Sequence, residues 1–215
     1  MTATELVAII NHWQTLIGSI LGGVFALGTA FVVASSAVRT ARRTAASLLI
    51  VDVLSILRVA ESLESLAKED GIDEKKYPLW VSEKLNWRRP QLSLSYDTHV
   101  ANLVGVHEGL SAHLSLLKMV YSGLNDHLTR IETDAEDRRT SGLPRIPRAP
   151  QATEADASVV ANGLKLAGAH ATCAAYLLEQ FVISRTPTFL KRIRMRVCPS
   201  AIEVKSKELL RDGGI

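Results

Sequence analysis

The longest apolar segment of the chain covers residues 16–38, LIGSILGGVFALGTAFVVASSAV. It holds 23 residues without a charge and is followed by Arg39, Arg42 and Arg43. A hydrocarbon core of about 30 Å requires roughly 20 apolar helical residues, so we predict one membrane-spanning helix over 16–38. A cleaved signal peptide is the alternative, but residues 1–15 lack positive charge and the apolar segment is longer than such peptides use.

The charges on the two sides of this segment predict its orientation. The short tail, residues 1–15, carries Glu5 and no lysine or arginine, whereas three arginines follow the span. Positively charged flanks stay in the cytoplasm, so we predict an inner (plasma) membrane protein with its N-terminus outside and its remaining residues cytoplasmic. Trp13 would lie at the outer interface or pack on a neighbouring helix. Residues 13–23, WQTLIGSILGG, resemble many short bacterial membrane anchors, a likeness that identifies no family.

Small residues recur at every fourth position of the span. Such stripes let helix backbones approach closely in lipid, where the hydrophobic effect contributes little to association. The pattern predicts a homo-oligomer or a partner helix, although glycine and alanine are also common in membrane helices. The stripe consists of Gly18, Gly22, Ala26, Ala30 and Ala34.

Three later segments, 44–67, 95–137 and 153–184, repeat apolar residues at steps of three and four, which indicates helices that pack through one seam. They form the predicted cytoplasmic domain, 39–184. The fold class we predict is all-α: a single N-terminal transmembrane helix followed by an antiparallel three-helix bundle or coiled-coil-like domain. The seam residues are Leu49, Val53, Ile56, Ala60, Leu63 and Ala67; Leu103, Val106, Leu110, His113, Leu117, Val120, Leu124, Leu128 and Ile131; Val160, Leu164, Ala167, Ala171, Ala174, Leu178 and Phe181.

Local signals place the ends of these helices. Nothing breaks the pattern between residues 16 and 68, so the span is expected to continue into the first helix and end at Asp70-Gly71. Asp52 falls on the polar stripe of that helix and is expected to be solvated. Thr153 and Asp156 have the spacing of a capping box, which predicts the start of the third helix.

Residues 71–94 are predicted to be irregular because Pro78 and Pro90 interrupt them, with a short helix possible over 81–87. Aromatic and arginine side chains that gather here are typical of binding surfaces. The alternative is that both tryptophan rings cap the end of the bundle core. The interaction candidates are Trp80, Trp87, Arg88 and Arg89.

Two basic segments follow. The linker 138–152 contains closely spaced prolines, which favour an extended connector. The tail 185–215 carries eight basic and three acidic residues, and its basic side chains predict contact with anionic lipid or, alternatively, docking of the tail on the bundle by its apolar side. Its IRMRV segment is also compatible with a short strand. The basic surface residues we single out are Arg145, Arg148, Lys191, Arg192, Arg194 and Arg196.

The remaining composition offers little chemistry. The net charge of +3 is too small to predict a nucleic-acid partner, and Cys173 and Cys198 lack the spacing of a zinc site. His107 and His113 are six residues apart, whereas a zinc-protease pair requires four, so His113 is expected in the core or at an interface. Phosphate-binding and nucleophile-elbow motifs are absent from the sequence. No metal or cofactor is expected.

These patterns favour a non-enzymatic scaffold or adaptor that assembles proteins at the membrane. Binding of anionic lipid or nucleic acid by the basic linker and tail is the alternative. An enzyme with an unfamiliar helical site is the third possibility, and it would require a buried cluster of convergent polar groups.

Overall fold

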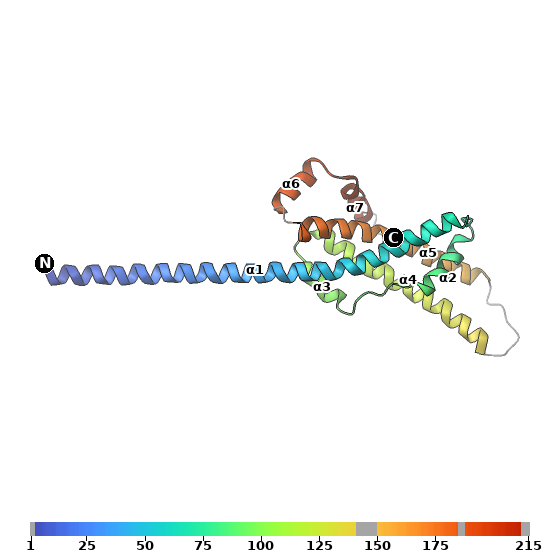
Figure 1. The fold of residues 1–215 in the computed structure, drawn as a ribbon, viewed down its shortest axis with the longest axis horizontal. Coiled ribbons are helices and arrows are strands. Elements are labelled where there is room, and N and C mark those ends of the chain that lie inside the picture. Colours follow the sequence, from blue (N-terminus) through green and yellow to red (C-terminus); the bar gives the residue numbers. More distant parts are fainter. Residues whose placement is uncertain (1–2, 141–149, 185–187, 212–215) are drawn as a thin grey trace. The chain divides into compact units, whose positions relative to one another are not determined.

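The computed structural model describes residues 3–140, 150–184 and 188–211, and every element in these ranges is a helix (Figure 1). The predicted all-α class is therefore confirmed. The elements are α1 (Ala3–Glu69), α2 (Tyr77–Trp87), α3 (Tyr96–Leu103), α4 (Glu108–Thr140), α5 (Pro150–Leu178), the π-helical turn η1 (Glu179–Ile183), α6 (Thr188–Val197) and α7 (Ala201–Arg211).

Helix α1 continues without a break from the apolar segment into the first seam, as the pattern predicted. The predicted end at Asp70-Gly71 is also confirmed. Gly71 takes a φ of +61°, a left-handed conformation that glycine adopts without steric cost. The Ile72 and Gly71 amides donate to the carbonyls of Ala67 and Lys68, which closes the helix in a Schellman motif.

The chain divides into two compact units, Met1–Arg42 and Arg43–Ile215. In the first unit, the large side chains of the apolar segment are exposed, including Phe25, Leu27 and Phe31. This helix is long and apolar enough to be a candidate membrane span. Helix α5 also meets that test of length and composition, but more than half of its apolar window is buried within the second unit. We therefore interpret α5 as a core helix.

The three predicted seams supply most of the core of the second unit, together with residues of α2 and α3. Residues 43–69 of α1 supply Leu49, Val53, Ile56 and Leu63, all fully buried. Helices α4 and α5 pack on each other and add their own seam residues to the same cluster, while α2 packs on α5. Alternation of three and four therefore identified the buried faces correctly.

Small residues let α5 approach its neighbours closely. A Cβ atom added at Gly168 would lie 3.2 Å from the Ala60 Cβ of α1, and one added at Gly163 would lie 3.4 Å from the Leu124 Cβ of α4. Larger side chains at these two positions would push the helices apart.

The single helix predicted over 95–137 is wrong, because the structure divides it into α3 and α4. Helix α3 ends at Leu103, and Gly105 has a φ of +83°, which right-handed helix does not allow. The seam nevertheless continues across the break, since Leu103 and Leu110 are both buried. Periodicity revealed the buried positions here but not the backbone turn between them.

The predicted boundaries of the linker 138–152 are wrong at both ends. Helix α4 extends to Thr140, and α5 begins at Pro150, before the expected capping box at Thr153. Proline is tolerated in a first helical turn because its missing N–H has no acceptor there. Residues 141–149, with the predicted basic residues Arg145 and Arg148, lie outside the described residues.

The irregular segment 71–94 contains α2, which confirms the short helix expected over 81–87 and extends it to Tyr77. The expectation for Asp52 is wrong. This carboxylate is partly buried and accepts hydrogen bonds from the Ser93 backbone N–H (3.2 Å) and hydroxyl (2.7 Å). Asp52 therefore ties the segment before α3 to α1, a contact between residues 41 positions apart.

The basic tail is helical. Helices α6 and α7 replace the short strand that its IRMRV segment allowed. A period of two over five residues is too short to decide between strand and helix, and the contacts described below hold this segment as a helix against the rest of the unit.

Candidate functional site

The predicted association stripe lies on the first unit. Gly18, Gly22, Ala26, Ala30 and Ala34 are all exposed along α1. Apart from its chain neighbours and the adjacent backbone of α1 itself, a Cβ atom built at Gly18 or Gly22 would meet nothing within 4 Å in the described residues. The stripe is therefore open in the single chain and accessible to another helix.

The interaction candidates separate into two groups. Trp80, Trp87 and Arg88 line a cavity of about 370 Å³ beside the end of α1. Trp80 packs partly on the core, whereas Trp87 is 86% exposed, so only one of the two rings caps the core. Arg89 does not line this cavity; its guanidinium forms an ion pair with Glu132 of α4 at 3.2 Å.

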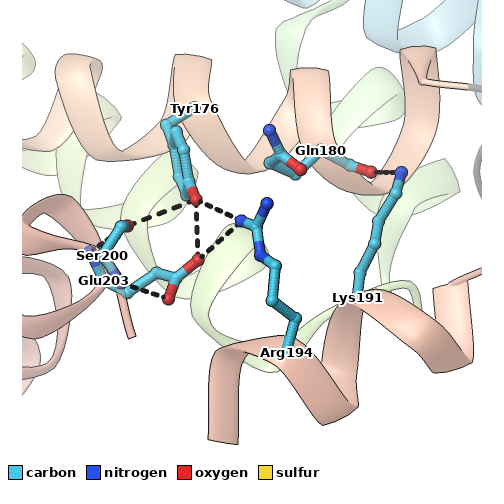
Figure 2. Close-up of polar contacts among 6 residues, drawn as sticks. All are labelled: Tyr176, Gln180, Lys191, Arg194, Ser200 and Glu203. Atoms are coloured by element: carbon cyan, nitrogen blue, oxygen red, sulfur yellow. Dashed lines mark hydrogen bonds and ion pairs between the residues drawn. The ribbon is translucent and has the colours of Figure 1, made fainter. Parts of the chain in front are cut away.

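A polar cluster fixes the C-terminal helices to the end of α5 (Figure 2). The Tyr176 hydroxyl of α5 donates to Glu203 Oε1 of α7 at 2.6 Å. Arg194 of α6 donates to the Tyr176 oxygen at 3.0 Å and lies 3.5 Å from Glu203 Oε1. One carboxylate thus joins three helices.

Glu203 also helps to cap the N-terminus of α7, its own helix. The Ser200 backbone N–H donates to Glu203 Oε2 at 2.8 Å, and the Glu203 N–H donates to Ser200 Oγ at 3.3 Å. This is a capping box, in which the side-chain oxygen of each residue accepts a hydrogen bond from the otherwise unpaired backbone N–H of the other. Burial opposes ionisation of Glu203, but hydrogen bonds from Tyr176 and Ser200 and the charge of Arg194 together hold its pKa below the ordinary value.

Three of the predicted basic surface residues are engaged within the unit. Lys191 is only 6% exposed, and its ammonium donates to the Gln180 carbonyl oxygen (Figure 2), so its assignment to a basic surface is wrong. Arg192 donates to the Val106 carbonyl oxygen at 3.1 Å, and Arg194 belongs to the Glu203 cluster. Arg196 is exposed and lines a cavity described below.

A second polar group lies deeper, where α4, α5 and α7 meet. His113 Nδ1 is 2.9 Å from His170 Nδ1, and His113 Nε2 is 2.7 Å from Ser206 Oγ. Both rings are fully buried, which agrees with the core position predicted for His113. The partnership with His170 was not predicted, because the two histidines are 57 residues apart.

Burial keeps both rings neutral. Burial, with a smaller contribution from His170, lowers the pKa of His113 to about 4, and burial also lowers the pKa of His170. Between two neutral rings, this hydrogen bond requires one Nδ1 to carry a proton and donate it to the other Nδ1. His170 Nε2 has no hydrogen-bond partner among the described residues.

A cavity of about 570 Å³ opens beside this group, between the start of α4 and the C-terminal helices. Its polar lining mixes cations with carboxylates and includes His107, Glu108, Arg192, Arg196, Glu203, Ser206 and Lys207. His107 stacks on Phe181 with ring centroids 4.4 Å apart, and its pKa is lowered by burial and by the charge of Arg192.

The arrangement of Ser206 and His113 has the contact that a nucleophile and its base require. Its electrostatics are unfavourable for that role, because a base with a pKa of about 4 accepts a proton weakly at neutral pH. The next group, His170, is a neutral ring, whereas a carboxylate would stabilise the imidazolium that forms. Among the described residues, no group of three or more His, Cys, Asp or Glu could hold a metal ion. The cluster is therefore better suited to hold α7 in place.

Sequence reasoning missed the Glu203 cluster although one signal for it was present. Ser200 and Glu203 have the S-x-x-E spacing of a capping box at the start of α7. Comparison with known proteins adds no family: no family model, curated protein or solved structure matches this chain.

Proposed function

We propose that this chain is a single-pass membrane protein, with its N-terminus outside and a cytoplasmic helical domain that assembles or recruits other proteins. The observation that carries the proposal is the exposed apolar face of α1, where Phe25, Leu27 and Phe31 are 73%, 74% and 75% exposed. Apolar side chains on every face of a long helix are stable in lipid but not in water. The arginines that follow residue 38 support the orientation.

In this proposal the second unit is an antiparallel bundle of three long helices. Residues 43–69 of α1, α4 and α5 contribute to one core, and α4 and α5 pack on each other although only residues 141–149 separate them. So short a connection brings the second helix back along the first.

The two open surfaces described above support an assembly role. The Gly18 stripe is accessible to a second helix, and the cavity beside Trp80 and Trp87 offers an aromatic surface to a protein partner. The hydrogen bonds of the His113 and Glu203 clusters join helices of the second unit, and this structural role accounts for both clusters. We therefore propose an assembly role without a catalytic reaction.

Thiol labelling of intact cells with a membrane-impermeant reagent tests the orientation. Cys198 is exposed and serves as the reporter, while Cys173 is buried and its pKa is raised by burial, so it should not react in the folded protein. We expect Cys198 to be labelled only after lysis. Labelling before lysis would place the helical domain outside the cell and overturn the proposal.

Replacing Gly22 with isoleucine is expected to weaken self-association of the span. The added side chain would separate backbones that meet at the stripe, and we expect a loss of the order of tenfold in association, or about 1.4 kcal/mol. Crosslinking in mild detergent or nanodiscs measures the oligomer distribution. Gly28→Ile is the control, because it adds the same bulk outside the stripe. An unchanged distribution in Gly22→Ile would exclude the stripe as the association surface.

A further inference from the structure

Helix α6 exposes four of its five apolar side chains and buries a lysine, while its fifth apolar side chain, Met195, packs partly on the core. Phe189, Leu190, Ile193 and Val197 are 61%, 51%, 51% and 74% exposed, whereas Lys191 is 6% exposed. A helix on the surface of a water-soluble domain normally has the opposite orientation. The apolar face of α6 is therefore directed away from the unit that carries it.

The four exposed apolar side chains and the basic side chains of α6 lie on separate sectors of the helix surface. At about 100° per residue, the four apolar side chains occupy an arc of about 100°. Arg196 borders this arc beside Phe189, and Arg194 borders it beside Leu190. The helix contains no acidic residue. An apolar stripe with arginines along both edges is the pattern of a helix that lies in the plane of a membrane surface.

Polar contacts on the other side of α6 hold this orientation. Lys191 donates to the Gln180 carbonyl, Arg192 donates to the Val106 carbonyl, and Arg194 contacts Tyr176 and Glu203. Turning the helix to bury its apolar face would break all three sets of contacts. The outward face is therefore a stable feature of the fold.

We propose that α6 lies in the headgroup region of an anionic membrane leaflet and inserts Phe189, Leu190, Ile193 and Val197 among the acyl chains. This inference rests on the proposed membrane attachment, because a protein that is anchored by α1 keeps α6 close to the lipid bilayer. The helix has ten residues and is about 15 Å long, too short to cross a bilayer but suited to its surface. The exposed guanidinium of Arg196 and the basic excess of the tail complement anionic headgroups.

Site-directed spin labelling of the full-length protein in nanodiscs tests the proposal. Cys198→Ser removes the exposed thiol, and buried Cys173 is retained. Single labels are then placed at Ile193 in the apolar face of α6, at Glu208 on the exposed side of α7, and at Phe25 in the span. Accessibility to oxygen, which concentrates in lipid, is compared with accessibility to a water-soluble nickel complex, with and without phosphatidylglycerol in the nanodisc.

We expect the label at residue 193 to be oxygen-accessible and protected from nickel, with protection increasing when phosphatidylglycerol is present, while the label at residue 208 stays accessible to nickel. Equal nickel accessibility at residues 193 and 208 would overturn the inference, and spin–spin broadening at residue 193 would assign the face to a second copy of the chain instead. The label at residue 25 separates the two proposals, because nickel access there would contradict the membrane span itself.

Discussion

Replacing Glu203 with alanine is expected to detach α7 from the rest of the second unit while α4 and α5 remain folded. The substitution removes the acceptor of the Tyr176 hydroxyl and of the Ser200 N–H, together with the ion pair to Arg194. Hydrogen bonds to a buried charged group contribute about 1.5–3 kcal/mol each, and part of this is recovered when water reaches the freed groups. We expect a net loss of about 3 kcal/mol, which corresponds to roughly a hundredfold loss of hydrogen-exchange protection in α7.

Hydrogen exchange followed by mass spectrometry measures this effect helix by helix. Glu208→Ala is the matched control, since Glu208 lies on the same helix and is exposed. Tyr176→Phe removes a single hydroxyl and should cause a smaller loss in the same segment. Equal protection of α7 in Glu203→Ala and Glu208→Ala would contradict the structural role assigned to the cluster.

Acidification is expected to destabilise the second unit between about pH 6.5 and pH 4 because His113 is buried in its neutral form. Its pKa is lower in the folded protein than in the unfolded chain. The contribution of His113 to the free energy of unfolding is therefore complete above pH 6.5. It decreases at lower pH as His113 binds a proton in the unfolded chain, until His113 of the folded protein also binds one near pH 4. The lowered pKa of His113 corresponds to a loss of roughly 3 kcal/mol in the free energy of unfolding. His170, whose pKa is also lowered by burial, should act in the same direction.

Unfolding by urea in mild detergent, followed by the fluorescence of Trp80 and Trp87, measures this dependence. His113→Gln cannot titrate and should flatten the pH profile, although the variant is expected to be less stable at neutral pH because it loses the contacts to His170 and Ser206. His99→Gln, outside the cluster, serves as the control. A profile in His113→Gln as steep as that of the unmodified protein would exclude His113 as the source.

These two clusters also show which features could not be predicted from the sequence. His113 was placed correctly in the core by its position in a seam, because periodicity reports which side of a helix is buried. Its partners His170 and Ser206 lie 57 and 93 residues away, and no local pattern connects them. Asp52 is a similar case: it falls on the polar stripe of α1, yet the segment that contains Ser93 folds back and leaves it only partly exposed.

Local sequence determined the helical class, the continuous α1, its end at Gly71 and the buried faces of the long helices, because each depends on interactions within a few residues. Tertiary structure decided the features that depend on distant contacts. Gly105 could have continued a helix and instead forms a turn, and the apolar residues of α6 would have been expected inside. Lys191, Arg192 and Arg194 turn that face outward, since their hydrogen-bond acceptors lie on segments that only the folded chain brings together.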